Sequence, residues 1–171
     1  ASTRPTADRV RESLFNILAG GRFGEAVIDA RVIDAFAGTG ALGLEALSRG
    51  ATHASFIERD PNALKTLRSN IARLGHEADA AVISGDATKI ASWRDDAAGL
   101  LLADAPYGSG EGLTVAARLA ELGALAPGAL VVIETERGES HDETALANAG
   151  LALLDDRHYG RARLHFLRYE E

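Results

Sequence analysis

The fold is decided by residues 31–50, which read RVIDAFAGTGALGLEALSRG. Residues 31–36 are apolar enough for a buried strand, and residues 41–48 show the pattern of a short helix that is stopped by Gly50. Between them, Gly38, Gly40 and Gly43 have the spacing G-x-G-x-x-G. Glycines at this spacing permit a tight turn and let backbone amides approach a ligand at a helix N-terminus. The same spacing also occurs in turns that bind nothing, so it is a weak signal alone.

Strand and helix patterns alternate along the rest of the chain. Further strands are predicted at residues 54–58, 81–84, 100–103, 130–133, 151–154 and 163–169. Helices are predicted after Thr6, after Asp60-Pro61, over residues 113–122 and after a capping box at Ser140–Glu143, with a turn at Pro127-Gly128 before the fifth strand. This alternation predicts an α/β fold with a mostly parallel sheet covered on both faces. Residues 1–171 contain no repeat or linker and are predicted to form one domain, with an N-terminal helix segment at residues 1–20.

The composition is that of a globular domain: 46% hydrophobic and 25% charged over 171 residues. The absence of cysteine excludes disulfides and thiolate metal sites and is typical of a cytoplasmic protein. The five histidines are scattered without metal-ligand spacing, so no metal site is expected. The longest apolar run is far too short for a membrane span, and no membrane partner is expected.

The net charge of −7 is unevenly distributed. Residues 157–168 hold four arginines, among them Arg161 and Arg163, and no acidic residue, while arginines also cluster in residues 1–22. A basic head and tail on an acidic body is typical of a nucleic-acid-binding surface. The alternative is that these arginines are merely solvated surface charges.

An acidic residue stands at the carboxyl end of each of the first four predicted strands: Asp34, Glu58, Asp86 and Asp104. In open α/β sheets the ligand binds at this edge. A row of carboxylates would repel the pyrophosphate of a dinucleotide but would suit a cofactor with a ribose, an amine and a cation. The sequence therefore favours S-adenosylmethionine, with Glu58 placed to accept hydrogen bonds from ribose hydroxyls.

The fourth predicted strand is followed by Asp104-Ala105-Pro106-Tyr107. The carboxylate can accept a hydrogen bond from an amine, a turn carbonyl can accept a second, and the aromatic ring can stack on a base. The alternative interpretation is an ordinary strand-ending turn with a surface tyrosine.

These motifs resemble the RsmD-type 16S rRNA guanine-N2 methyltransferases, a family of the class I S-adenosylmethionine-dependent superfamily. The resemblance covers nearly the whole chain and is carried by TRPTADRVRE at residues 3–12, DAFAGTGALGLEALSRG at residues 34–50, Tyr159-Gly160 and Arg163-Leu164. It implies a seven-stranded sheet with the last strand antiparallel, and methylation of a guanine amine in 16S rRNA, within a small-subunit particle. We expect a monomer, and the resemblance implies a basic, glycine-rich arm before residues 1–20.

The resemblance also implies roles for individual residues. Those of the cofactor site would be Asp34 at the methionine amine, Ala37, Gly38 and Gly40 in the loop, Glu58 and Arg59 near the ribose, Asp86 and Ala87 near the adenine, and Arg4 and Thr6 over the methionine carboxylate. The target base would be held by Asp104, the Ala105 carbonyl, Pro106 and Tyr107.

Three alternatives remain open at this point. The turn does not identify the base, so the chain could methylate an adenine or cytosine amine in RNA or DNA. The glycine loop alone would also suit a nicotinamide-dependent oxidoreductase, against which the acidic strand ends count. Ala105 replaces the first proline of the family's usual turn, which is the one argument for a non-catalytic RNA-binding module.

Overall fold

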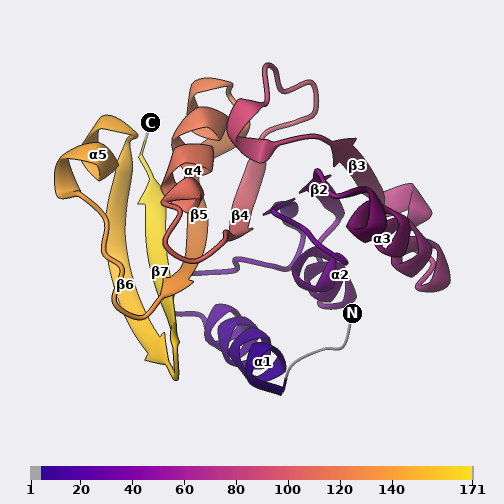
Figure 1. Ribbon diagram of the computed structural model, residues 1–171, viewed down its shortest axis with the longest axis horizontal. Helices are drawn as coiled ribbons and strands as arrows, with labels where there is room; N and C mark the ends of the chain where they lie inside the picture. The colour runs from indigo at the N-terminus through magenta and orange to yellow at the C-terminus, as the bar shows by residue number, and fades with distance from the viewer. Residues whose placement is uncertain (1–4, 171) are drawn as a thin grey trace.

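The computed structural model describes residues 5–170, with side chains described from residue 7. Within that range one sheet contains seven strands in the order β3-β2-β1-β4-β5-β7-β6 (Figure 1). The strands are β1 (Arg31–Ala35), β2 (His53–Glu58), β3 (Ala80–Ser84), β4 (Ala98–Asp104), β5 (Leu125–Glu136), β6 (Leu151–Tyr159) and β7 (Ala162–Tyr169). The α-helices are α1 (Pro5–Ala19), α2 (Ala41–Ser48), α3 (Pro61–Arg73), α4 (Glu111–Glu121) and α5 (Glu143–Asn148), and short 3₁₀ turns cover Glu77–Asp79 (η1) and Ala87–Lys89 (η2).

The sheet is mostly parallel, as predicted. The pairs β3–β2, β2–β1, β1–β4 and β4–β5 are parallel, whereas β7 is antiparallel to both β5 and β6. The α/β fold, the seven strands and the antiparallel last strand are therefore confirmed. Among residues 5–170, no helix is both long enough and apolar enough to cross a membrane.

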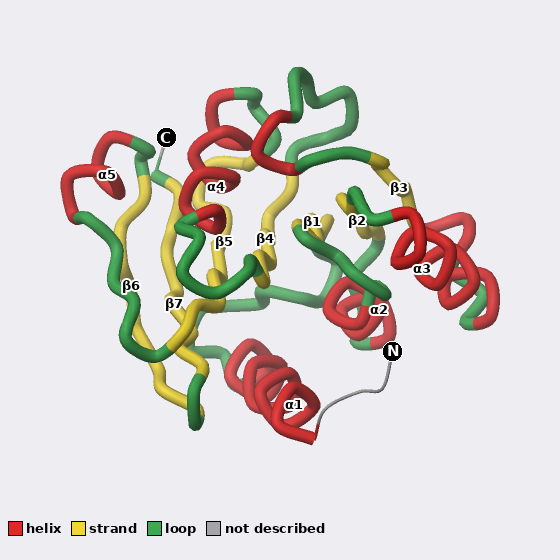
Figure 2. The backbone as a smooth tube through the Cα atoms, viewed as in Figure 1, coloured by secondary structure: helices red, strands yellow, loops and turns green. Residues whose placement is uncertain are grey.

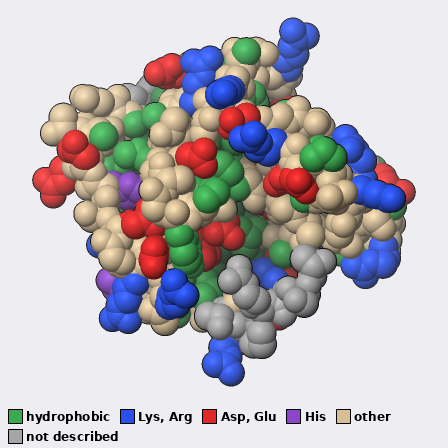
Figure 3. All heavy atoms as spheres, viewed as in Figure 1, with side chains coloured by type: hydrophobic (Ala, Val, Ile, Leu, Met, Phe, Trp, Pro, Cys, Tyr) green, Lys and Arg blue, Asp and Glu red, His purple; other side chains and the backbone are tan. Residues whose placement is uncertain are grey.

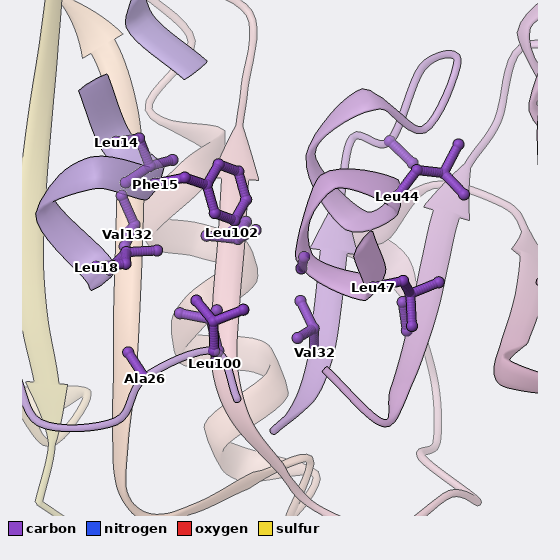
Figure 4. Packing of buried hydrophobic residues seen from close by; sticks show 14 of the residues in the cluster. Leu14, Phe15, Leu18, Ala26, Val32, Leu44, Leu47, Leu100, Leu102 and Val132 are labelled. Atoms are coloured by element: carbon purple, nitrogen blue, oxygen red, sulfur yellow. The ribbon is translucent and has the colours of Figure 1, made fainter. Parts of the chain in front are cut away.

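The two faces of the sheet are covered by different helices. Apolar side chains of α1, α2 and α3 pack on one face, against Val32, Phe56, Leu100, Leu102 and Val132. Figure 4 shows Leu14, Phe15 and Leu18 of α1 beside Leu102 and Val132, and it shows Leu44 and Leu47 of α2 in the same cluster as Val32. Side chains of α4 and α5 pack on the other face, against Ile33, Leu101, Val131 and Ile133. Side chains alternate between the two faces of a sheet along each strand. The face on which a buried residue packs therefore also determines the face toward which the residue two positions later, at the strand end, projects.

Because the central strands are parallel, their carboxyl ends meet at one edge of the sheet. Figure 2 shows the loop after β1, which leads to α2, and the loop after β4 in the middle of the molecule. These are the glycine loop and the Asp104–Tyr107 turn of the sequence, so the parallel arrangement brings the two motifs together.

Four local predictions were wrong. Thr6 lies inside α1, which already includes Pro5, and does not precede it. Helix α5 begins at Glu143 and is capped by Asp142, whose carboxylate accepts a hydrogen bond from the Thr144 amide at 2.9 Å, so Ser140 opens no capping box. Pro127-Gly128 lies within β5, where its pairing with β4 shifts register; an irregular ladder tolerates a proline.

The fourth error concerns β6, which extends to Tyr159 and is not confined to residues 151–154. Its second half is polar, a composition that is typical of a turn. Cross-strand partners explain why it is a strand: Arg163 of β7 binds both carboxylate oxygens of Asp156. Such pairs stabilise a sheet without any apolar alternation in the strand itself.

Candidate active site

A cavity of about 750 Å³ opens at the carboxyl ends of β2, β3, β4 and β5. Its walls come from three of the predicted strand-end acids, Glu58, Asp86 and Asp104, and from the turn that follows β4. Ala7 and Val10 of α1 complete it on one side. Figure 3 shows acidic side chains next to hydrophobic ones in the middle of this face of the molecule, where Figure 1 places the ends of β4 and β5. A cavity of this size with mixed walls is typical of a small-molecule site.

The glycine loop lies beside the cavity, and glycine is needed at its positions for different structural reasons. Gly38 and Gly40 have φ angles of 58° and 89°, which glycine adopts at little cost. A Cβ added to Gly43 would lie 2.4 Å from Phe56 Cε1, so α2 can approach the sheet only because this residue has no side chain. Ala37, Gly38 and Gly40 are not among the residues that line the cavity itself.

Asp34, at the end of β1, lies beneath the loop and is only 1% exposed. It accepts a hydrogen bond from the Gly43 amide at 2.9 Å. Burial raises its pKa well above the usual range, the Gly43 amide opposes this, and the charges of Asp104 and Glu58 add to the rise. A cation brought next to this carboxyl would offset the neighbouring carboxylates and lower its pKa again.

Glu58 connects the glycine loop to the start of α3. Its Oε1 accepts a hydrogen bond from the Gly38 amide at 2.7 Å, and its Oε2 accepts one from the Asp60 amide at 2.9 Å. The carboxylate nevertheless lines the cavity. Each carboxylate oxygen has two lone-pair sites, so these two amides use half of the acceptor capacity of Glu58.

Asp86 and Arg59 form the neighbouring part of the wall. The Asp86 carboxylate caps η2 by accepting hydrogen bonds from the Thr88 hydroxyl and amide, which lower its pKa, and Arg59 lies 3.4 Å away. Ala87 follows and is buried at the cavity wall.

The turn after β4 brings the residues predicted to hold the base into the same cavity. Asp104, Ala105, Pro106 and Tyr107 all line it, and Ala105 is 6% exposed. The Pro106 carbonyl accepts a hydrogen bond from the Ser109 hydroxyl at 2.6 Å, which closes the turn. Local hydrogen bonds of this kind hold a turn in one conformation without a second proline.

Tyr107 is tied to a residue that the sequence analysis missed, Glu134 at the end of the fifth strand's buried run. The phenol donates a hydrogen bond to Glu134 Oε2 at 3.2 Å. Burial and then the charge of Glu134 raise the pKa of Tyr107 to about 12, so the phenol keeps its proton at neutral pH. Glu134 lines the cavity and follows the apolar residues 130–133, the same strand-end signal that identified the first four acids.

Arg161 and Arg163, the two arginines considered for nucleic-acid binding, differ in whether the guanidinium is already bound within the fold. The Arg161 side chain is 84% exposed at the mouth of the cavity, 3.5 Å from Glu136. Arg163 is bound by Asp156 and by the Glu139 carbonyl, so its guanidinium is already used within the fold. Arg4 and the side chain of Thr6 lie outside the described residues. Among the residues that the structure does describe, no group of three or more potential ligands could hold a metal ion.

The strand order, the glycine loop and the acidic cavity at the carboxyl edge together define the methyltransferase class of α/β folds. A solved structure described as "Putative methyltransferase yhhF from Escherichia coli" agrees: it superposes with a TM-score of 0.80 at 32% identity, over 99% of this chain and 89% of that one. A conserved hypothetical protein from Streptococcus pyogenes superposes with a TM-score of 0.77 at 26% identity, over 94% and 95% of the two chains.

Sequence comparison narrows the class. The family model described as "Conserved hypothetical protein 95" matches residues 1–168, and the chain belongs to this family, the RsmD family. It is 39% identical over 133 residues to ribosomal RNA small subunit methyltransferase D of Escherichia coli K12, a match that covers 78% of this chain and 64% of the relative. The protein of that name from Haemophilus influenzae is 32% identical over 137 residues, 78% of this chain and 68% of the relative. The chain thus spans just under two thirds of the length of the first of these relatives.

Proposed function

We propose that the chain transfers a methyl group from S-adenosylmethionine to the exocyclic N2 amine of a guanine in 16S rRNA, within a small-subunit particle. The observation that carries this proposal is that one cavity holds both the strand-end acids Glu58 and Asp86 and the Asp104–Tyr107 turn. Relatives named as small-subunit rRNA methyltransferases support the RNA substrate.

The walls of the cavity suit the cofactor. Glu58 offers acceptors for the ribose hydroxyls, Asp86 an acceptor for the adenine amine, and Ile57 and Ala87 apolar surface for the ring. The buried carboxyl of Asp34 lies next to the glycine loop, where a cationic amine would be stabilised. When bound, this cofactor supplies an electrophilic methyl group. No metal is required for that chemistry.

The turn residues provide what the target amine needs. The lone pair of a guanine amine is delocalised into the ring and is a poor nucleophile. Hydrogen bonds from the amine to the Asp104 carboxylate and the Ala105 carbonyl favour a pyramidal nitrogen and orient its lone pair. The Tyr107 ring stacks on the base. These residues act through orientation and electrostatics, which are the terms that preorganised polar groups contribute to a rate.

Calorimetric titration of the purified protein tests the cofactor. We expect it to bind S-adenosylmethionine and to bind NADH weakly or not at all, since the acidic wall repels a pyrophosphate. Tight NADH binding without binding of S-adenosylmethionine would favour the alternative function, a nicotinamide-dependent oxidoreductase.

The variant Asp104→Ala tests the chemical role of the turn. Loss of one preorganised electrostatic group lowers turnover by a factor on the order of 10² or more. We expect cofactor affinity to change little in this variant, because Asp104 acts on the amine. Equal losses of turnover and cofactor affinity would show instead that Asp104 is a binding residue.

Arg161 tests the RNA partner. If it contacts a phosphate, Arg161→Ala lowers the slope of log affinity against log salt concentration by about one. Arg163→Ala is the matched control: it should lower thermal stability, since Asp156 would lose its partner, and leave the slope unchanged. A parent-like slope in Arg161→Ala would make Arg161 a solvated surface charge.

A further inference from the structure

Glu134 is a cavity residue that the sequence motifs leave without a role. We propose that its carboxylate accepts a hydrogen bond from the ring N1–H of the target base and thereby selects guanine against adenine and cytosine. This inference rests on the proposed function, base-amine methylation, and adds the residue that determines which base is accepted.

The sheet places Glu134 beside Asp104. The two residues are register partners on the adjacent parallel strands β5 and β4. Neighbouring strands lie about 4.8 Å apart, and register partners project to the same face. That face is the one of Leu102 and Val132, which α1 covers. The two carboxylates therefore border the same part of the cavity, next to the Ala105 carbonyl.

Tyr107 orients Glu134. Its phenol donates to Glu134 Oε2 at 3.2 Å and keeps its proton at neutral pH, so it serves as a donor and leaves the carboxylate an acceptor. A carboxylate has about four lone-pair sites, so it can accept from the phenol and from a base at the same time. The residue that would stack on the base thus also fixes the carboxylate at the edge of that base.

The hydrogen-bonding edges of the bases explain the selection. In guanine the 2-amine lies next to the ring N1–H, so both of these neighbouring groups are hydrogen-bond donors. In adenine and cytosine the amine stands beside a ring nitrogen that is an acceptor. Asp104 and the Ala105 carbonyl can accept a hydrogen bond from the amine of any of the three bases. Glu134 can accept a hydrogen bond from the ring N1–H of guanine, but it would repel the acceptor ring nitrogen of adenine or cytosine. Sites built on such a contact discriminate strongly, because the analogue leaves a polar group unpaired.

The test compares guanine with 2-aminopurine at the target position of the RNA. The target is first mapped with the parent protein, and the RNA is then prepared with either base. 2-Aminopurine keeps the 2-amine, but its N1 is an acceptor. It also lacks the 6-oxygen, an effect that is the same for parent and variant and cancels when their preferences are compared. The measured quantity is the ratio of kcat/KM for the two bases.

We expect the parent to prefer guanine and Glu134→Gln to reduce that preference by about ten- to a hundredfold, the effect of a hydrogen bond to a charged group, because the glutamine amide can donate to N1 of 2-aminopurine. Glu121→Gln is the matched control. Glu121 pairs with Arg118 at 3.3 Å, is not a cavity residue, and should leave the ratio unchanged. The affinity for S-adenosylmethionine and the thermal midpoint are measured alongside.

A preference for guanine that is the same in the parent and in a folded Glu134→Gln would overturn the inference and leave the proposed function intact. Methylation of adenine or cytosine by the parent would also overturn it. A parent that methylates no RNA would remove the proposed function, and the inference with it. Should Glu134→Gln not fold, Tyr107→Phe keeps the ring but removes the donor, and it should lower the preference several-fold; an unchanged preference there would count against the inference.

Discussion

Glu58 has two proposed roles, one in holding the glycine loop and one in binding the cofactor, and Glu58→Gln tests the first. The carboxylate accepts one hydrogen bond from the Gly38 amide and one from the Asp60 amide, at 2.7 and 2.9 Å. Glutamine has a single acceptor oxygen, so one of the two amides would face the side-chain NH₂ group. The variant therefore loses one charge-assisted hydrogen bond and places a donor against a donor.

The size of the effect follows from these contacts. Loss of a partner for a buried polar group costs about 1–3 kcal/mol, and because this site is only partly buried we expect about 1–2 kcal/mol. For a domain of this size each kcal/mol lowers the thermal midpoint by about 2–4 °C, so the expected fall is roughly 2–8 °C.

Thermal unfolding followed by circular dichroism at pH 7 measures this fall. Glu45→Gln is the control: Glu45 pairs with Arg49 at 2.7 Å on the surface of α2, a pair worth about 0.3–0.5 kcal/mol. A midpoint for Glu58→Gln no lower than that of Glu45→Gln would refute the structural role of Glu58.

The cofactor role is measured on Glu58→Ala by calorimetry. Hydrogen bonds to a charged group contribute about 1.5–3 kcal/mol, so we expect affinity for S-adenosylmethionine to fall by roughly tenfold to a few hundredfold. Unchanged affinity in a folded variant would restrict Glu58 to holding the loop.

Three further variants test other parts of the structure. Gly43→Ala places a Cβ 2.4 Å from Phe56 Cε1, and such overpacking should cost about 1–3 kcal/mol; an unchanged midpoint in thermal unfolding would contradict the packing. Asp34→Asn removes a carboxyl whose pKa burial raises in the folded protein, so the folded state binds its proton more tightly than the unfolded state and stability falls as pH rises above the usual aspartate range. We therefore expect Asp34→Asn to unfold at a higher temperature than the parent at pH 8, with the difference shrinking toward pH 4, and the opposite order at pH 8 would refute it. Ala105→Pro should leave turnover the same or raise it several-fold at most, since Pro106 already restricts Ala105, whereas methylation seen only after this change would show that the second proline is essential.

The parts of the fold that were predictable are those with local signals. An acidic residue at or just past the end of an apolar run marked four strand ends, and the parallel sheet brings Glu58, Asp86 and Asp104 to one cavity. Helix α2 was predicted with its observed bounds because Gly40 and Gly50 flank an apolar stretch.

The parts that were not predictable depend on residues distant in sequence. The polar half of β6 is a strand because Arg163 of β7 binds Asp156 across the sheet. The role of Glu134 depends on two neighbours that are distant in sequence. The sheet register places it beside Asp104, and a side-chain hydrogen bond joins it to Tyr107. Likewise, the arginine-rich sequence of residues 157–168 does not predict which guanidinium is bound within the fold and which is exposed.

The most direct test of the proposed activity is to incubate the purified protein with S-adenosylmethionine carrying a labelled methyl group and small-subunit particles that lack methylation, and then to digest the RNA and identify the labelled nucleoside. We expect label in N2-methylguanosine, at one position, and a loss of about 10² or more in the rate with Asp104→Ala. Label in an adenine or cytosine amine, or no label in RNA from a protein that binds the cofactor, would contradict it.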